Sequence, residues 1–508
     1  MVQGTGSSVG KSVLATALCR IFSQDGYRVA PFKAQNMSLN AGVTPDGLEM
    51  GRAQVVQADA ARVVPSVDMN PVLLKPEADH RAQLVVMGRP AGTLDAVEYP
   101  SRKARLWEVV TSALDRLRAA FEIVVVEGAG SPAEINLRRG DIVNMEVALH
   151  ARAPVLLVGD IDRGGVFASL YGTVMLLDEA ERRLLGGLVI NKFRGDQSLL
   201  EPGLRQIEQL TRVPVIGVVP YYRDIYIPEE DAARAARISA ASDGSTRQTD
   251  VVVVALPHMS NFDDFDPIAR ERRVTLRYAR GADELGAPDL IIIPGTKTTL
   301  EDLQHLRASG MAEAVLRLAA SGTPMIGICG GYQMLGAKIK DPLAIESDQA
   351  SIRDLGGARG RGLGLLGVET RFAAEKKTEQ ITACVTVDEG LLRGARGLQF
   401  DAYEIHMGDT AGVEAVRPAV VVGKASASGA ERVIGYASDD GWVLGTYTHG
   451  MFADTRLRRL VLSNVARRRG VELRFDEDTF SQSQEFDKLA ELVRTSLDMG
   501  RIGEMLGL

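Results

Sequence analysis

Short apolar runs that end in polar residues recur along the first half of the chain, and they restrict its fold more than any other feature. Four of them are predicted strands, at residues 122–130, 154–160, 188–194 and 213–219. Strands with little polar alternation are typical of parallel sheets, because helices cover both faces of such a sheet. Stretches suited to helices separate the runs, so the sequence predicts an α/β fold with a doubly wound parallel sheet.

A glycine-rich loop, Gly4 to Ser12, lies directly before an amphipathic helix. The backbone amides of such a loop can surround phosphate oxygens, while Lys11 reaches the terminal phosphates and the Ser12 hydroxyl binds magnesium. The strict motif has glycine where this chain has Thr5, and the longer spacing resembles that of dethiobiotin synthetase and its relatives. Little sequence precedes the loop, so we expect either a clipped strand or a start upstream of Met1. The expected ATP-binding residues of the loop are Gly4, Thr5, Gly10, Lys11 and Ser12.

Polar residues end the predicted strands, on the edge of the sheet where open α/β folds bind their ligands. Lys33 is expected to neutralise phosphate charge, and Glu127 to be a second magnesium ligand. Asp160 is another candidate for the metal. Asn191 and Lys192 occupy the place at which related nucleotide-binding folds contact the base. We therefore expect ATP and Mg²⁺ to bind this half of the chain, and we expect no prosthetic group.

Three further polar residues are candidate substrate contacts. Residues 28–33 are predicted to form another strand, and Asn36 follows it. Asn70 and Lys75 belong to one later stretch, 69–76. A lysine at the end of a strand is usually only solvated. Here two such lysines lie beside asparagines and near a phosphate loop, which equally suggests a functional role. Both interpretations, a solvated lysine and a functional one, stay open.

The stretch from Pro324 to Leu335 is predicted to be a buried strand that turns abruptly into a helix, with Cys329 at the turn. Gly327, Gly330 and Gly331 allow the backbone to form a cramped turn that lifts the sulfur clear of the sheet edge. The N-terminus of the following helix favours a thiolate, which is the reactive form. A lone cysteine is more often a small core residue, but this placement between glycines favours a nucleophile.

Two other segments are expected to complete a site around Cys329. His449 follows a short apolar strand and is a candidate base for the cysteine. A third apolar strand ends in a tight turn that contains Gly295. The backbone amides of Gly295 and Gly330 could together form an oxyanion hole.

These segments resemble the glutaminase domain of the triad-type glutamine amidotransferases, over about residues 250 to 470. The resemblance implies that ammonia is released from glutamine through a thioester on the cysteine. Familiar members have a glutamate two residues after the histidine, where this chain has Met451. A Cys329–His449 dyad is therefore predicted, without an identified third member. Farther along the chain, the alternating stretch 401–408 places Glu404 and His406 on one face of a strand, and we consider them either substrate contacts or satisfied core residues.

At 508 residues the chain is too long for one hydrophobic core and is expected to form two or three domains. The net charge of −7 argues against a general nucleic-acid binder. Three scattered cysteines are too few for a disulfide framework or a zinc site, which indicates a reducing compartment. No apolar run is long enough to span a bilayer. We therefore expect a cytoplasmic protein that binds neither nucleic acid nor membranes.

Several stretches across nearly the whole chain closely resemble the cobyric acid synthase family, which hydrolyses glutamine in cobalamin biosynthesis. They are residues 4–12, 31–40, 69–76, 255–266 and 403–408. The resemblance implies ATP-dependent amidation of the b, d, e and g carboxylates of adenosylcobyrinic acid a,c-diamide. It also implies that the partners are small molecules, namely a corrinoid acid, glutamine and ATP. Because ammonia reacts poorly with a carboxylate, we expect ATP to activate each acid as an acyl phosphate.

The same resemblance implies two domains of doubly wound architecture, the second with a flavodoxin-like sheet. Residues 1–228 are expected to form an ATP-binding amidoligase domain, and residues 250–472 a glutamine amidotransferase domain. Alanine, serine, arginine and aspartate dominate residues 229–249, which indicates a linker. Residues 473–508 are charged and predicted to form a C-terminal helical extension. The sequence does not predict an oligomeric state.

Two other functions stay open. The sister family, cobyrinic acid a,c-diamide synthase, shares both domains but has a Gly-Pro-Asp-Tyr stretch where this chain has Lys33 to Asn36. That family, or another amidoligase of the same build, is the nearer alternative. A partitioning-type ATPase has a similar phosphate loop and represents a different class, but it needs neither Cys329 nor His449.

Overall fold

The structure is a computed structural model that describes residues 1–78, 81–95, 99–138, 140–222, 224–228, 248–346, 359–423, 431–476 and 480–508. The chain divides into two compact units. The first comprises Met1–Ser38, Leu48–Glu230 and Phe480–Leu508, and the second comprises Leu39–Gly47 and Asp231–Thr479. Most of the predicted linker, 229–249, lies outside the described residues. Within the described residues, no helix has the length and apolar character needed to cross a bilayer.

The first unit is built on parallel strands, as the apolar runs predict. Its central sheet has the order β1-β10-β11-β12, and β2 pairs in parallel with β9. A parallel bridge between Val2 and Glu127 connects β1 to the end of β9. The predicted α/β class with a parallel sheet is thus confirmed. These strands are β1 (Val2–Gly4), β2 (Val29–Phe32), β9 (Ile123–Val126), β10 (Val155–Asp160), β11 (Leu185–Phe193) and β12 (Val215–Pro220).

A smaller mixed sheet with the order β3-β6-β7-β8 also belongs to the first unit. Strand β3 (Gln35–Met37) runs parallel to β6 (Val72–Ala78), while β7 (Arg81–Val86) and β8 (Arg89–Asp95) pair in antiparallel fashion. The stretch with Asn70 and Lys75 therefore enters this side sheet rather than the main parallel sheet. Polar and apolar residues do not alternate clearly there, so sequence alone did not distinguish the two sheets.

Helix α1 follows the glycine-rich loop and buries most of the apolar face that the sequence predicts, including Leu14, Leu18 and Ile21. Helix α2 begins directly after Gly51, and eight of its ten residues are buried. The helices of the first unit in this part of the chain are α1 (Lys11–Gln24), α2 (Arg52–Ala61), η1 (Val67–Met69), α3 (Tyr99–Ala120), α4 (Met145–Ala151), α5 (Val166–Leu176), α6 (Glu179–Arg182), η2 (Gln197–Leu199) and α7 (Glu201–Thr211).

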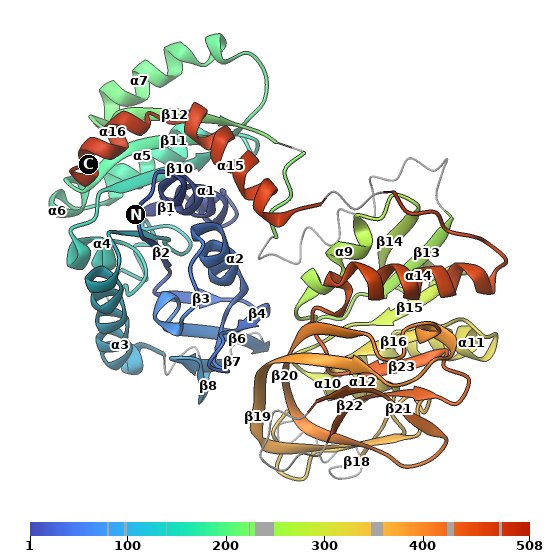
Figure 1. Ribbon diagram of the computed structural model, residues 1–508. Coiled ribbons are helices and arrows are strands. Elements are labelled where there is room, and N and C mark those ends of the chain that lie inside the picture. Colours follow the sequence, from blue (N-terminus) through green and yellow to red (C-terminus); the bar gives the residue numbers. More distant parts are fainter. Residues whose placement is uncertain are drawn as a thin grey trace. The chain divides into compact units, whose positions relative to one another are not determined.

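The last two helices, α15 (Gln482–Ser496) and α16 (Met499–Leu506), belong to the first unit and not to a separate extension. Figure 1 shows α15, in red, beside α1, in blue. The buried Arg20 on α1 donates from Nε to Asp487 Oδ1 at 2.7 Å and from Nη2 to Ser483 Oγ at 2.7 Å. The helical character of this end was predicted, but an amphipathic pattern does not reveal which partner covers the apolar face.

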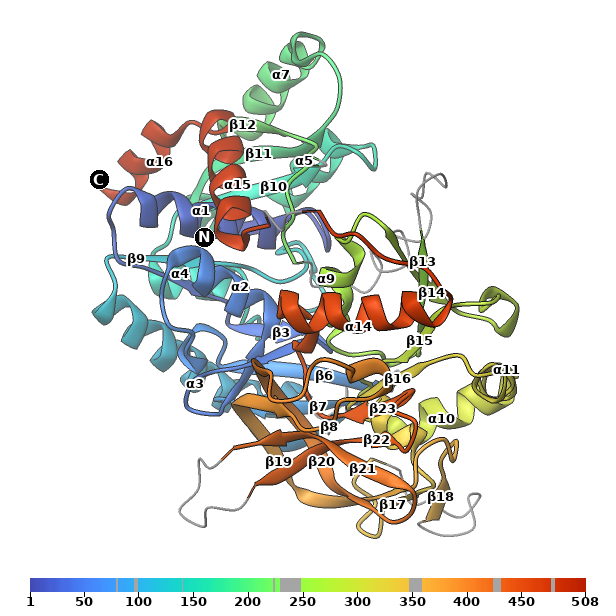
Figure 2. The same cartoon turned by 45° about the vertical axis from the view of Figure 1, so that its right-hand side comes forward.

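The second unit contains a large sheet whose first half is parallel, with the order β14-β13-β15-β16-β23. Beyond β23 the sheet continues through β22, β21, β19, β17 and β18, mostly in antiparallel pairs, and β20 pairs with β19. Figure 2 shows these later strands beside β23. The strands are β13 (Thr249–Val254), β14 (Val274–Ala279), β15 (Leu290–Ile293), β16 (Met325–Ile328), β17 (Lys338–Lys340), β18 (Arg359–Arg361), β19 (Val368–Val385), β20 (Gln399–Gly412), β21 (Val416–Val422), β22 (Arg432–Ser438) and β23 (Val443–Thr446).

Helices flank the parallel half of this sheet, and α14 contacts β13 on one face. The helical elements are η3 (Phe262–Phe265), α9 (Asp266–Ala269), η4 (Ala282–Glu284), α10 (Thr299–Ala308), α11 (Met311–Ala320), α12 (Gly330–Leu335), η5 (Gly390–Leu392), η6 (Met451–Ala453) and α14 (Thr455–Arg468).

A short segment from the first half of the sequence, Leu39–Gly47, belongs to the second unit. It contains β4 (Ala41–Val43), and the Ala41 backbone N–H donates to Asn261 Oδ1 at 3.0 Å. Gln380 Nε2 donates to the Val43 carbonyl at 2.6 Å. The first unit is therefore interrupted at this segment, whereas the family resemblance implies one continuous domain over residues 1–228.

Candidate active sites

The structure places Cys329 at a strained turn between β16 and α12. Its backbone has φ 52° and ψ −110°, a conformation that residues other than glycine rarely adopt. A Cβ atom at Gly331 would overlap the Ile293 carbonyl, so α12 can approach β15 only because glycine stands there. Cys329 is 8% exposed, and its N–H donates to the Thr446 carbonyl at 2.9 Å. The predicted strand, turn and helix are all present.

The structure brings His449 to Cys329, and their side chains interact. His449 follows β23, the strand that pairs with β16, which explains how residues far apart in sequence meet at one sheet edge. The Tyr403 ring stacks on the imidazole with centroids 5.3 Å apart. His449 is only 1% exposed, so its position is set by packing on every side.

Asp264, on η3, is a third member of this group that sequence reasoning missed. Its Oδ2 lies 2.7 Å from His449 Nδ1, and its Oδ1 accepts the Gly450 N–H at 2.8 Å. A carboxylate only accepts hydrogen bonds, so the proton stays on Nδ1 and Nε2 faces the sulfur. Burial disfavours the charged imidazolium, but the Asp264 carboxylate outweighs this effect and the pKa of His449 is raised to about 10.

The two glycines of the predicted oxyanion hole lie close to this group. Gly295 follows β15, and a Cβ atom there would lie 3.1 Å from His449 Cε1. Gly330 is the first residue of α12 and packs against Thr296, the neighbour of Gly295. The turn after β15 and the start of α12 therefore meet beside Cys329. The role of their amides stays a prediction.

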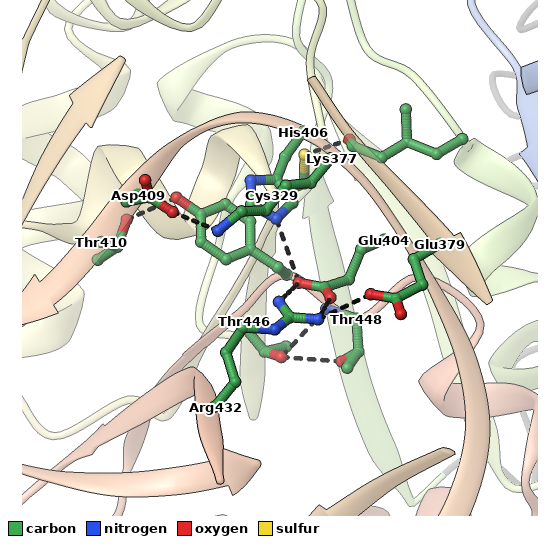
Figure 3. A network of polar contacts seen from close by, with 12 residues as sticks. Cys329, Lys377, Glu379, Glu404, His406, Asp409, Thr410, Arg432, Thr446 and Thr448 are labelled. Atoms are coloured by element: carbon green, nitrogen blue, oxygen red, sulfur yellow. Dashed lines mark hydrogen bonds and ion pairs between the residues drawn. The ribbon is translucent and has the colours of Figure 1, made fainter. Parts of the chain in front are cut away.

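Glu404 and His406 lie on β20 and face the same side, as the alternation predicts (Figure 3). His406 Nε2 lies 3.1 Å from Glu404 Oε1, and its ring stacks on Tyr447 with centroids 3.6 Å apart. Arg432 donates to both oxygens of Glu404. Burial raises the pKa of Glu404, but His406 and Arg432 together lower it to about 2. Both residues have protein partners, which favours the interpretation of satisfied core residues.

This buried network nevertheless borders the cysteine. The Cys329 thiol donates to the carbonyl of Ile405, the residue between Glu404 and His406, at 3.4 Å. Gln333 on α12 donates to the Tyr447 hydroxyl at 3.2 Å and to the Met407 carbonyl at 3.1 Å. β20 therefore forms one wall of the space around the sulfur.

In the first unit, the glycine-rich loop joins β1 to α1 as the motif predicts. Gly10 has φ 103°, and a Cβ atom there would overlap the Asn191 amide. Lys11 Nζ donates to the carbonyls of Gly6 at 2.7 Å and Gly130 at 3.1 Å. At the start of the loop, the Thr5 N–H donates to the Val158 carbonyl at 2.9 Å, which continues the β1 ladder. The loop is thus anchored on both sides.

Asn191, Lys192 and Asp160 gather on the other side of the loop. Asn191 Nδ2 donates to the Val9 carbonyl at 2.8 Å, and Lys192 Nζ donates to the Ser8 carbonyl at 2.7 Å. Lys192 also pairs with Asp160 Oδ2 at 2.8 Å. These contacts support the shape of the loop, and Asp160 is already paired with the Lys192 ammonium. A base-binding role for Asn191 and a metal-binding role for Asp160 stay predictions.

Lys33, directly after β2, and Ser12, in the first turn of α1, converge on the carboxylate of Glu127. Ser12 Oγ donates to Glu127 Oε1 at 2.7 Å and Lys33 Nζ donates to the same oxygen at 2.9 Å. Gln57 Nε2 on α2, which sequence reasoning missed, donates to Oε2 at 2.6 Å. Burial raises the pKa of Glu127, but Lys33 and these hydrogen bonds lower it below its usual value.

The Ser12 hydroxyl and the Glu127 carboxylate suit Mg²⁺. Both are hard oxygen donors, and their 2.7 Å contact shows that one ion could bind both. The described residues contain no group of three or more His, Cys, Asp or Glu side chains that could hold a metal. Mg²⁺ does not need such a group, because it usually keeps several waters and binds one or two carboxylates plus phosphates.

The remaining residues that were predicted to contact substrate form hydrogen bonds or ion pairs with other protein groups. Asn70 Nδ2 donates to the carbonyls of Lys33 and Val72, and its Oδ1 accepts the Gly51 N–H. Lys75 pairs with the buried Glu49 at 2.8 Å. Asn36 Nδ2 donates to Gln54 Oε1 at 3.1 Å. These contacts give Asn70 and Lys75 structural roles, and their contact with substrate stays a prediction.

Comparison with known proteins matches both halves of the chain. Residues 250–457 match the model of the CobB/CobQ-like glutamine amidotransferase domain, and residues 1–232 match that of the CobQ/CobB/MinD/ParA nucleotide binding domain. The chain is 49% identical over 508 residues to the cobyric acid synthase of Dehalococcoides mccartyi, covering 100% of this chain and 98% of that protein. It is 48% identical over 514 residues to the cobyric acid synthase of Moorella thermoacetica, covering 100% and 97%. A solved structure named "Crystal structure of glutamine amidotransferase" aligns at 18% identity with a TM-score of 0.31, covering 44% of this chain and 99% of that chain.

Proposed function

This chain belongs to the cobyric acid synthase family, and we propose that it converts adenosylcobyrinic acid a,c-diamide into adenosylcobyric acid. The reaction amidates the b, d, e and g carboxylates, with glutamine as the nitrogen source and ATP as the activating substrate. One observation carries the proposal. A single chain holds both a Cys329–His449–Asp264 group and a phosphate loop beside Lys33 and Glu127.

The second unit is proposed to release ammonia from glutamine. His449 takes the proton of the Cys329 thiol at Nε2 and, because its pKa is raised to about 10, holds it as an imidazolium beside the thiolate. The thiolate attacks the carboxamide carbon of glutamine. The charged imidazolium then protonates the leaving ammonia. Asp264 stabilises this imidazolium and keeps the reactive Nε2 toward the sulfur. Water finally cleaves the thioester to give glutamate.

The first unit is proposed to phosphorylate the corrinoid carboxylate. Phosphoryl transfer relies on positioning and on neutralising charge, and Lys11 and Lys33 supply two cations for the phosphates. Ser12 and Glu127 would hold Mg²⁺, which would supply positive charge to neutralise the phosphates. The acyl phosphate is a far better electrophile than the carboxylate, so ammonia can displace phosphate and leave a primary amide.

The other two interpretations explain less of the structure. A partitioning-type ATPase requires no nucleophile, yet Cys329 sits at a strained turn beside a histidine with a buried carboxylate partner. Cobyrinic acid a,c-diamide synthase would use the same two sites, so this alternative must be separated by its substrate.

The test incubates purified protein with ATP, Mg²⁺, glutamine and one of two corrinoids, followed by mass spectrometry. With adenosylcobyrinic acid a,c-diamide we expect four successive mass decreases of about one unit each, because each step replaces a hydroxyl group by an amino group. Adenosylcobyrinic acid serves as the comparison. Conversion that stops once the a and c groups are amidated would contradict the proposal and favour the sister activity, and ATP hydrolysis without any amide would favour the partitioning class.

A further inference from the structure

Helix α2 carries two fully buried glutamines on one face. Gln54 and Gln57 are both 0% exposed, and their spacing of three residues places them one above the other along the helix. A glutamine amide has two donors and two acceptor sites. Burying two of them in one place is costly unless their polar atoms are bonded.

The side-chain nitrogen of Gln57 is hydrogen-bonded, but its oxygen is not. Its Nε2 donates to Glu127 Oε2 at 2.6 Å, and because an ionised carboxylate only accepts, this contact sets the orientation of the amide. Its Oε1 is buried and has no hydrogen-bond partner among the described residues. A buried acceptor therefore stays unpaired, within the described residues, beside the Glu127 cluster.

Gln54 shows the opposite pattern. Its Oε1 accepts from Asn36 Nδ2 at 3.1 Å, while its Nε2 is buried without a partner in the part of the chain that the structure describes. Together the two residues offer one free donor and one free acceptor. Native proteins rarely leave such atoms unpaired, and each one that remains needs an explanation, such as a catalytic role or a water or ion that binds there.

The chemistry of the reaction limits which group can fill these positions. The corrinoid carboxylate and the phosphates of ATP carry only acceptor oxygens once ionised, so they suit Gln54 Nε2 but not Gln57 Oε1. Ammonia carries N–H groups and suits Gln57 Oε1. The site also lies beside Glu127, where Lys33 and Ser12 converge and where the carboxylate is proposed to be phosphorylated.

We propose that Gln57 positions ammonia, and Gln54 the acyl oxygen, for formation of the new amide. This inference rests on the proposed function. A hydrogen bond from ammonia to Gln57 Oε1 leaves the nitrogen lone pair available for the acyl carbon. The C–N bond forms, the bond from carbon to the phosphate oxygen breaks with its electron pair, and the nitrogen releases one proton to the departing phosphate. The product amide matches the pair, with its oxygen toward Gln54 and an N–H toward Gln57.

The test measures amidation with added ammonium chloride in place of glutamine. Gln57→Leu should raise the KM for ammonia about tenfold, the loss expected for one buried hydrogen bond, with the KM for ATP within about twofold of wild type. It should also release more ADP than amide, because water competes for the acyl phosphate. Glutamine hydrolysis at Cys329 should be unchanged.

Two further variants separate this role from simple support of Glu127. Gln57→Lys keeps a donor toward Glu127 but offers no acceptor, so it should retain the ammonia defect. Gln83→Leu, on β7, removes another glutamine whose Oε1 is buried and unpartnered, and it should behave as wild type. An unchanged KM for ammonia in Gln57→Leu, or recovery in Gln57→Lys, would overturn the inference. Wild-type protein that amidates no corrinoid would instead overturn the proposed function.

Discussion

Replacing Asp264 by asparagine should disable the glutaminase while leaving the size of the side chain unchanged. Asp264 uses one oxygen for His449 Nδ1 and the other for the Gly450 N–H. Asparagine has only one oxygen. If that oxygen keeps the Gly450 contact, its NH₂ group faces Nδ1, and the proton of the imidazole must move to Nε2. In that tautomer His449 cannot accept the Cys329 proton.

The size of the effect follows from the pKa of His449. Its rise from 6.5 to about 10 corresponds to about 5 kcal/mol of preference for the imidazolium, at about 1.36 kcal/mol per pKa unit. Asp264 is the largest of the groups that raise it. Loss of this preference, together with the wrong tautomer, should lower kcat for glutamine hydrolysis roughly ten-thousandfold, as the same change does in serine protease triads.

The assay compares glutamate release from glutamine with amide formation from ammonium chloride. Asp264→Asn should lose the first activity and keep the second, since the ligase site lies in the other unit. Asp263→Asn, one residue earlier on η3, is the matched control and should retain both activities. Glutamate release within tenfold of wild type by a folded Asp264→Asn protein would refute the reasoning.

Three further predictions concern the same two sites. Cys329→Ala should abolish glutamine-dependent amidation but keep ammonium-dependent amidation, and product mass from glutamine at the wild-type rate would locate the nucleophile elsewhere. Lys11→Ala should stop amidation from both nitrogen sources while the thioester on Cys329 still forms. Labelled oxygen from the substrate carboxylate should appear in phosphate with wild type but not with this variant, and its absence in both would exclude an acyl phosphate. Folded His449 binds its proton more tightly than the unfolded chain, so its contribution to stability is complete below about pH 6.5 and is lost as pH rises toward 10. Between about pH 6.5 and 10, the free energy of unfolding in urea should fall by up to about 5 kcal/mol more for wild type than for Asp264→Asn. Parallel plots of this free energy against pH would disprove the coupling.

Sequence could predict the features that depend on local pattern. Apolar runs indicated parallel strands, and because parallel strands end at a common edge, Ser12, Lys33 and Glu127 could be grouped from their positions in the chain alone. The elbow at Cys329 was equally local, since strand, glycines and helix are contiguous. His449 required only that its strand end at the same edge.

Features that depend on distant contacts could not be predicted in this way. Asp264 lies 185 residues before His449, and nothing in its neighbourhood marks one aspartate of an acidic run as the partner. Lys75 resembled a substrate contact because sequence does not show that Glu49 pairs with it. The side sheet of β3, β6, β7 and β8 was missed because its strands lack a clear alternation.

The interleaved course of the chain has a consequence for synthesis. Arg20 finds its carboxylate partner 467 residues later, in Asp487, so the first unit cannot be completed on the ribosome until the second has been translated. Until α15 arrives, the face of α1 that it covers has no native partner and is open to chaperones or to aggregation. The same topology means that cutting the gene between the halves would not yield two independent enzymes. A fragment that contains the whole first unit would also need residues 480–508, and one that contains the whole second unit would also need residues 39–47.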